Sequence, residues 1–240
     1  MKPRPIFLSP HPDDAVWSCG PLLLAARDRG EDPLVVTVFD GDPQDGGVAA
    51  EGWRRLAAPD LRRLENTRAL DRLGIEGLSL GFVDAALRGT REAPACCAPE
   101  DLTGELSDMD SPLVERLRAR LAPVLADALL VHAPVAGTGT HVDHRLLRAA
   151  LGASSMAAPL ILYEDFPYPV PSPPTGFAAR TEPADIGAWI AAAGLYRSQI
   201  AALFAGRDAF ESALRAFAAA RGHGTGERYG IRVWAESAAR

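Results

Sequence analysis

Lysine is almost absent from this chain. The 240 residues include 25 lysines and arginines, and all of these except Lys2 are arginine. Lys2 stands in the N-terminal segment, where few contacts can desolvate an ammonium group. The sequence therefore argues against a Schiff-base lysine, a cofactor-bearing lysine and the phosphate-binding lysine of a P-loop. Its chemistry must come from carboxylates, histidines, arginines or a metal.

Cysteines and basic clusters are also scarce. The three cysteines are Cys19, Cys96 and Cys97, and an odd number that includes an adjacent pair does not indicate a disulfide framework. The net charge is −6 and no lysine- or arginine-rich stretch occurs, which argues against nucleic acid as the main partner. We expect a small-molecule partner, and a homo-oligomer is compatible with the sequence.

Long apolar runs are missing as well. The longest, residues 121–135, is interrupted by Asp127, by His132 and by prolines, so we expect no membrane span. The N-terminal segment turns polar after a short apolar run, which is too brief for a secretion signal. Together with the cysteine content, this predicts a cytoplasmic protein.

The chain does contain an alternation of strand and helix patterns in a globular composition, 48% hydrophobic and 23% charged. We expect strands at residues 5–9, 34–39, 78–80, 128–132, 160–163 and 229–234, and helices at 16–29, 60–73, 111–126, 142–151, 186–205 and 208–220. This order predicts an α/β fold with a doubly wound, mostly parallel sheet. We expect one domain over residues 1–240, with the helices of 186–220 packed on it.

Two segments are expected to be loops. Residues 81–110 show no periodic pattern and hold two of the cysteines. Residues 167–183 hold six prolines, which exclude a helix and favour a semi-rigid surface loop. This second loop is either a lid over the functional site or a plain surface connection.

Two other loops carry the residues best suited to chemistry. In a doubly wound sheet the site lies beyond the carboxyl ends of the strands. There the chain reads Ser-Pro-His-Pro-Asp-Asp at residues 9–14 and Gly-Thr-His-Val-Asp-His at residues 139–144. These loops hold three of the five histidines, each beside carboxylates. Histidine and aspartate ligands with one open position are typical of catalytic zinc, and other first-row divalent metals accept the same donors.

Each motif alone also has a structural interpretation. The first fits a proline turn with an aspartate capping the next helix, and the second fits a capped helix start with a solvated histidine. His132 ends a strand and is expected to be structural, while the role of His223 stays open. Cys19 falls in a predicted helix, where a core position is favoured over a nucleophile.

The two motifs resemble those of the PIG-L/LmbE-like deacetylases. These are metal-dependent, usually zinc-dependent, hydrolases of N-acyl groups on amino sugars and related conjugates. Further stretches that resemble the family are residues 62–65, 80–84, 163–168 and 227–229. The resemblance covers nearly the whole chain and implies a Rossmann-like three-layer α/β sandwich.

Carried over by position, the resemblance implies a Zn²⁺ site formed by His11, Asp14 and His144. Asp13 would be the general base that takes a proton from the attacking water. Where the family's first motif commonly ends in glutamate, this chain has Ala15. A branch with similar openings also lacks that glutamate, so Ala15 removes a supporting partner of the site without implying loss of activity.

The resemblance implies further roles at the same edge of the sheet. His141 would be the cation that stabilises the oxyanion or protonates the leaving amine. Asp143 would orient a histidine, and next to His141 it would raise the pKa of that imidazole and keep it cationic. Arg62 and Asp84 would bind sugar hydroxyls, although Arg62 also fits a solvated helix residue.

The resulting prediction is a zinc-dependent deacetylase of an N-acetyl amino sugar or glycoconjugate. One alternative is an amidase acting on a non-sugar N-acyl substrate, such as a thiol conjugate or a natural-product intermediate. Another is a non-catalytic module that binds carbohydrate. A nucleotide-binding α/β protein lacks support, because the first strand–helix turn is not glycine-rich.

Overall fold

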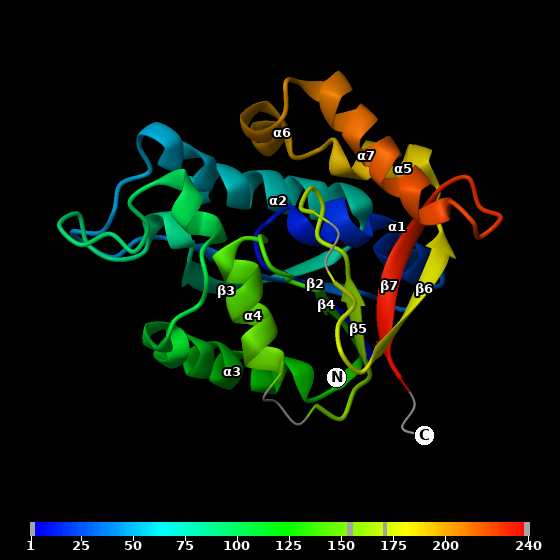
Figure 1. Cartoon of the computed structure of the whole chain (residues 1–240), viewed down its shortest axis with the longest axis horizontal. Helices are drawn as coiled ribbons and strands as arrows, with labels where there is room; N and C mark the ends of the chain where they lie inside the picture. Colours follow the sequence, from blue (N-terminus) through cyan, green and yellow to red (C-terminus); the bar gives the residue numbers. More distant parts are fainter. Residues whose placement is uncertain (1–2, 153–155, 170–171, 238–240) are drawn as a thin grey trace.

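Seven strands form one mixed sheet within residues 3–152, 156–169 and 172–237, which the computed structural model describes (Figure 1). The spatial order is β3-β2-β1-β4-β5-β7-β6. The strands are β1 (Arg4–Ser9), β2 (Leu34–Gly41), β3 (Glu76–Val83), β4 (Ala128–Pro134), β5 (Leu160–Tyr163), β6 (Phe177–Pro183) and β7 (Gly230–Glu236). Strands β1 to β5 pair in parallel, and β7 runs antiparallel to both β5 and β6. The predicted α/β fold with a mostly parallel sheet is confirmed.

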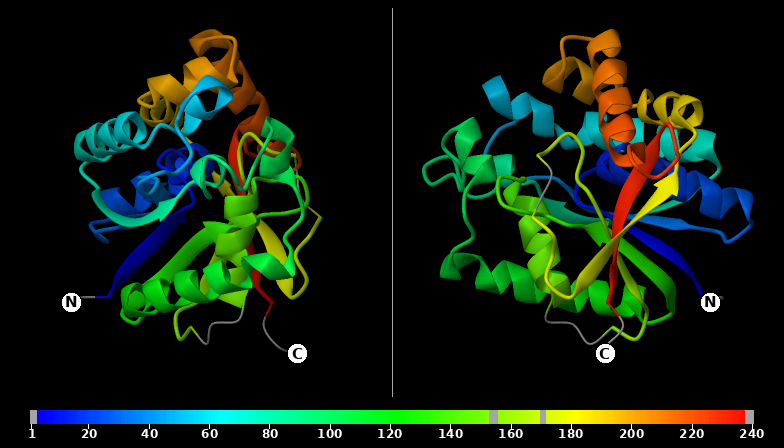
Figure 2. Two further views of the ribbon diagram at one scale, coloured as in Figure 1. Left: turned by 90° about the vertical axis from the view of Figure 1, so that its left-hand side faces the viewer. Right: turned by 45° about the vertical axis from the view of Figure 1, so that its right-hand side comes forward.

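Helices cover both faces of this sheet. The α-helices are α1 (Asp14–Asp28), α2 (Pro59–Leu73), α3 (Ser111–Leu125), α4 (Val142–Gly152), α5 (Ile186–Ala193), α6 (Arg197–Leu203) and α7 (Arg207–Gly222). Short 3-10 turns are η1 (Gly52–Ala57), η2 (Ala85–Leu87), η3 (Pro99–Thr103) and η4 (Asp108–Asp110). Figures 1 and 2 show α3 and α4 on one face and α1, α2, α5 and α7 on the other. None of the described helices is both long and apolar enough to cross a membrane.

Strand β1 shows how alternating side chains divide the core in two. Ile6 and Leu8 join the apolar cluster beneath α3 and α4, whereas Phe7 joins the cluster beneath α1, α5 and α7. Successive side chains of a strand point to opposite faces, so a central strand covered on both sides is apolar throughout. The same reason explains the fully buried run of β2.

The C-terminal helices are attached to α1 by two tryptophans. Trp17 Nε1 donates to the Ala193 carbonyl and Trp189 Nε1 donates to the Val16 carbonyl, both at 3.0 Å. Gly20 makes this approach possible, because a Cβ there would lie 2.7 Å from a ring atom of Trp189. The first turns of α1 are therefore held against the packed layer of C-terminal helices.

Three expectations about elements need correction. Residues 177–183 form an edge strand paired with β7, so neither the loop nor the lid interpretation holds for them. Proline is tolerated there because it stands at the end of an edge strand. The single helix expected at 186–205 is two helices: Gly194 ends α5, and Tyr196 turns into the core, where its hydroxyl donates to Asn66. Strand β3 is also longer than the three residues predicted.

Two minor expectations are confirmed. His132 is buried and stacks on Phe7, with ring centroids 4.2 Å apart, and burial lowers its pKa to about 3. Cys19 is fully buried in α1 and its thiol donates to the Ala15 carbonyl, while burial raises the thiol pKa well above its usual value. Both residues thus belong to the core.

Candidate functional site

The two histidine-containing motifs meet at the carboxyl ends of the neighbouring strands β1 and β4. The first motif forms the turn between β1 and α1, and the second opens α4. Their six imidazole and carboxylate side chains are all buried: His11, Asp13, Asp14, His141, Asp143 and His144. Burying so many ionisable groups costs free energy unless they form ion pairs or hydrogen bonds or bind a metal. The contacts described below give each of the six side chains such a partner.

The turn before α1 does not use its aspartates as ordinary helix caps. Asp13 occupies the N-cap position but makes no side-chain cap hydrogen bond. Ser9 Oγ accepts from the Ala15 amide at 2.9 Å and so replaces the missing cap. Asp14 instead accepts from the His11 amide at 2.7 Å. The simple capping interpretation of this motif is therefore wrong.

His11, Asp14 and His144 bring their donor atoms together. One carboxylate oxygen of Asp14 lies 3.2 Å from His11 Nδ1 and 3.1 Å from His144 Nε2. Metal–ligand distances of about 2.0–2.1 Å in a tetrahedral arrangement place the donors about 3.3 Å apart. His144 Nε2 is buried and has no hydrogen-bond partner among the described residues. The donor types, the spacing and this unpartnered nitrogen all fit a divalent ion.

Both histidines of this group are oriented by a carboxylate on the other ring nitrogen. His144 Nδ1 lies 2.6 Å from Asp165 Oδ1, and His11 Nε2 lies 3.1 Å from Asp143 Oδ2. Such carboxylate–histidine pairs fix the ring and increase its basicity in metal sites. Sequence reasoning assigned no role to Asp165, although its place two residues after the end of β5 was a signal for it.

Asp143 differs from its expected role at His141. Its carboxylate accepts from the Ala85 amide at 2.9 Å, from Arg88 and from His11, whereas His141 Nδ1 lies 3.8 Å away. Burial, and then the charge of His11, lowers the pKa of His141 to about 3. Asp143 raises the pKa of His141, as predicted, but burial and His11 outweigh it, so the cationic form is not favoured, and a metal beside His11 would also oppose it.

His141 has a defined tautomer as a result. Its Nδ1 accepts from the Asp143 amide at 3.2 Å, so the proton of the neutral ring belongs on Nε2. A neutral imidazole of this tautomer can donate one hydrogen bond. His141 is thus suited to donate a hydrogen bond from Nε2 as a neutral ring, and not to act as a cation.

Asp13 lies beside the group of three ligands and is held by Arg62. Arg62 Nη2 donates to Asp13 at 2.8 Å, and its other terminal nitrogen donates to Asp84 at 3.3 Å. Arg62 is only 7% exposed, which excludes the solvated-helix interpretation. Burial raises the pKa of Asp13, and Arg62 only partly opposes this. A buried carboxylate with a raised pKa, fixed on one side, is suited to accept a proton.

A second group of ionisable side chains shares His11 with the first. Donor atoms of His11, Asp84, His141 and Asp143 all lie within 4.8 Å of one another. Here, however, Asp84 is occupied by Arg62 and the Ala86 amide, and Asp143 by Arg88 and the Ala85 amide. The His11, Asp14 and His144 group is therefore the better metal site.

Without a metal, both histidines of the candidate ligand group are cationic at pH 7. Burial alone would lower their pKa values, but nearby carboxylates raise that of His11 to about 9 and that of His144 to about 10. Because both values exceed the ordinary 6.5, their contribution to the stability of the metal-free protein is fully present below pH 6.5 and is lost as the pH rises through about 9 to 10.

Metal uptake at pH 7 should therefore release about two protons per ion. Titration calorimetry in two buffers of different ionisation enthalpy measures this number. The apparent affinity should weaken as the pH falls below about 9 to 10, because protons compete for the same nitrogens. Identical heats in both buffers would contradict the assignment of His11 and His144 as ligands.

Asp165→Asn provides a test of the orienting carboxylate. Losing the charge beside His144 should weaken metal affinity about 10- to 100-fold. Competition with a chelator of known affinity measures the change. Glu164→Gln is the matched control, since Glu164 precedes Asp165, is equally buried and binds Arg221 away from the ligands. Equal affinities for the two variants would remove Asp165 from the site.

Comparison with known proteins places this site in a family. The family model described as "PIG-L: GlcNAc-PI de-N-acetylase" matches residues 6–154, which include both motifs. The chain belongs to the PIG-L family. The 2'-N-acetylparomamine deacetylase of Streptomyces fradiae is 36% identical to this PIG-L family chain over 171 residues, 69% of this chain and 57% of the relative. The corresponding deacetylase of Niallia circulans is 31% identical over 68% of this chain and 66% of its own.

A solved structure extends the likeness to the whole PIG-L family chain. The zinc-inhibited form of teicoplanin deacetylase has a TM-score of 0.81 and 27% identity, covering 99% of this chain and 100% of that one. The chain nevertheless spans less than two thirds of the curated relatives' own length. The family and the fold are thus established.

Proposed function

We propose that this protein is a metal-dependent N-deacetylase of an N-acetyl amino sugar or a glycoconjugate that contains one. The observation that carries the proposal is the convergence of His11, Asp14 and His144, with Asp13 beside them. Zinc is the metal that we propose, because nitrogen and carboxylate donors in this number suit catalytic zinc. The relatives support the reaction, since they are named as deacetylases of acetylated amino sugars.

Amide hydrolysis needs an activated water, a site for the oxyanion and a proton for the amine. An ion held by His11, Asp14 and His144 would supply the Lewis acidity for activating water and polarising the carbonyl. Asp13 accepts the proton of the attacking water through the carboxylate oxygen that Arg62 does not hold. Its raised pKa brings it nearer to the working pH, where a base is most effective.

The same residues complete the reaction. His141 donates its Nε2 proton as a hydrogen bond to the developing oxyanion, and one such donor is worth about 3–4 kcal/mol. Asp13 then returns the proton it has taken to the leaving amine. Arg62 is a positioning residue in this scheme, because it holds Asp13 and Asp84 instead of reaching solvent.

The test combines metal analysis with amine release. The purified protein, stripped and reloaded with zinc, is assayed on N-acetylglucosamine, its methyl glycoside and N-acetyl thiol conjugates. We expect one ion per chain and amine release from the sugars that depends on it. Release from the thiol conjugates alone would favour the amidase alternative, and metal binding without any release would favour a carbohydrate-binding member.

We further propose that residues 1–240 act as one domain in a reducing, cytoplasmic compartment. The helices of 186–222 support the first part, because α5 and α7 share an apolar cluster with α1 and β1. The free thiols of Cys19, Cys96 and Cys97 support the second.

A further inference from the structure

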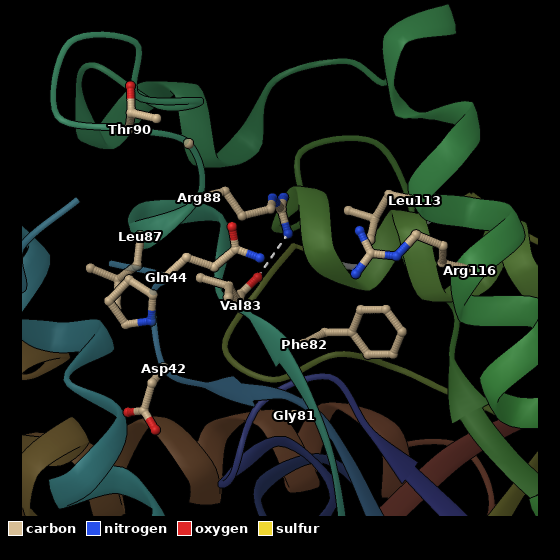
Figure 3. A pocket seen from close by; sticks show the side chains of 12 residues that line it. Asp42, Gln44, Gly81, Phe82, Val83, Leu87, Arg88, Thr90, Leu113 and Arg116 are labelled. Carbon is tan, nitrogen blue, oxygen red and sulfur yellow. Dashed lines mark hydrogen bonds between the residues drawn. The ribbon is translucent and has the colours of Figure 1, made fainter. Parts of the chain in front are cut away.

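A cavity of about 430 Å³ lies next to the candidate site, at the same edge of the sheet (Figure 3). Its walls are the segments that follow β2 and β3, together with the first half of α3. An adjoining cavity of about 460 Å³ shares Gly81, Phe82 and Arg116 with it. A volume of this order accommodates a small-molecule group.

The segment 84–88 separates this cavity from the buried carboxylates. On one side, the Ala85 amide and the Arg88 guanidinium bind Asp143, which orients His11. On the other side, Leu87 and Arg88 line the cavity. Figure 3 shows the Arg88 guanidinium beside the Val83 carbonyl, to which it donates at 3.3 Å. The segment 84–88 thus contacts the candidate site on one side and the cavity on the other.

The charge of the cavity walls is positive. Arg116 and, in the adjoining cavity, Arg120 form no ion pair with any residue in the described part of the chain. The acid that lines the cavity, Asp42, is already bound by Arg63 at 3.0 Å. The charge of Arg88 is matched by Asp143. An incoming anion would therefore meet the guanidinium groups of Arg116 and Arg120, which no carboxylate of the described residues neutralises.

The walls also offer an apolar surface. The Arg116 guanidinium lies 5.7 Å from the centroid of the Phe82 ring, and Leu113 stands beside it on α3. Figure 3 shows the Phe82 ring and the Arg116 and Leu113 side chains gathered at this end of the cavity. Arginine above an aromatic ring forms a platform on which planar groups stack while an anion is bound.

We infer that this cavity is a substrate subsite for an anionic group carried on an apolar or aromatic arm beyond the amino sugar. The placement of the amide rests on the proposed function, whereas the preference for anions rests on Arg116, Arg120 and Phe82. Cationic arms are disfavoured, because the Arg116 and Arg120 guanidinium groups, which form no ion pair within the described residues, repel them. The subsite therefore determines specificity.

Three aryl glycosides of N-acetylglucosamine test this inference: the 4-carboxyphenyl, the phenyl and the 4-(aminomethyl)phenyl compounds. Binding is measured by titration calorimetry on the metal-free protein, so the result does not depend on turnover. We expect the carboxyphenyl compound to bind about five- to tenfold more tightly than the aminomethyl compound, as for partly exposed charge pairs. The ratio should approach one in 1 M salt, where charges are screened within about 3 Å.

Two variants locate the effect. Arg116→Gln should bring the ratio of the carboxyphenyl affinity to the aminomethyl affinity toward one. Arg116→Glu should make the aminomethyl compound the tighter ligand. Arg215→Gln removes the same charge from the exposed face of α7 and should leave the ratio at its wild-type value. Equal binding of the three compounds, or an equal response of the Arg116 and Arg215 variants, would overturn the inference. Amine release is measured separately, so an inactive protein that still prefers the anion would refute only the proposed function.

Discussion

Asp13→Asn should lower kcat by about 10²–10⁴-fold while the protein keeps its metal. The carboxylate lies beside the ligand group but is not part of it, and the Arg62 guanidinium holds it. An asparagine of the same shape fills the site without accepting a proton. Steady-state kinetics on an N-acetyl sugar gives kcat, and metal analysis of the same sample gives the number of ions per chain.

A matched variant separates the role of Asp13 from the general cost of neutralising a buried acid. Asp40→Asn changes another buried aspartate at the same edge of the sheet, where it accepts from Ser79 and the Gly81 amide. This control should cost some stability and leave kcat within a few-fold of wild type. A wild-type rate in Asp13→Asn would show that another group accepts the proton, and a loss of metal would show that Asp13 supports the ligands.

His144→Ala should have the largest effect on metal content. His144 Nε2 is buried, lies 3.1 Å from Asp14 and has no hydrogen-bond partner among the described residues, so its removal takes away a metal donor and leaves Asp14 without one of its two imidazoles. The metal affinity should fall by more than the roughly 10- to 100-fold that is typical when a carboxylate supporting a ligand is lost. The effect should therefore be larger than that of Asp165→Asn. Metal analysis after dialysis against a weak chelator should find close to none, and activity should fall with it.

The control for this experiment is His223→Ala. His223 is exposed in the loop that follows α7, so its substitution removes a histidine without touching the site. Metal content and activity should match those of wild type. Full metal content in His144→Ala would exclude it as a ligand, whatever its effect on the rate.

Several elements could be predicted because their signals are local. The apolar runs of β1, β2 and β5 and the glycine after α2 predict strands and a helix end within a few residues of those observed. The division of residues 186–205 into α5 and α6 was missed although Gly194 was a local signal for it, because the surrounding alanines favour a continuous helix. The packing of Tyr196 against Asn66 shows why the chain turns there.

By itself, the sequence predicted the residues that we propose for the chemistry and the edge of the sheet at which they lie. The motifs at 9–14 and 139–144 follow strands, and parallel strands bring their carboxyl ends together. The tertiary structure decided which carboxylate faces which imidazole. Asp143 orients His11, 132 residues away, and Arg62 holds Asp13, 49 residues away. The physical reason is that side-chain direction and burial depend on packing between distant segments. No local pattern encodes that packing, whereas one lysine in 240 residues already pointed to a site without amine chemistry.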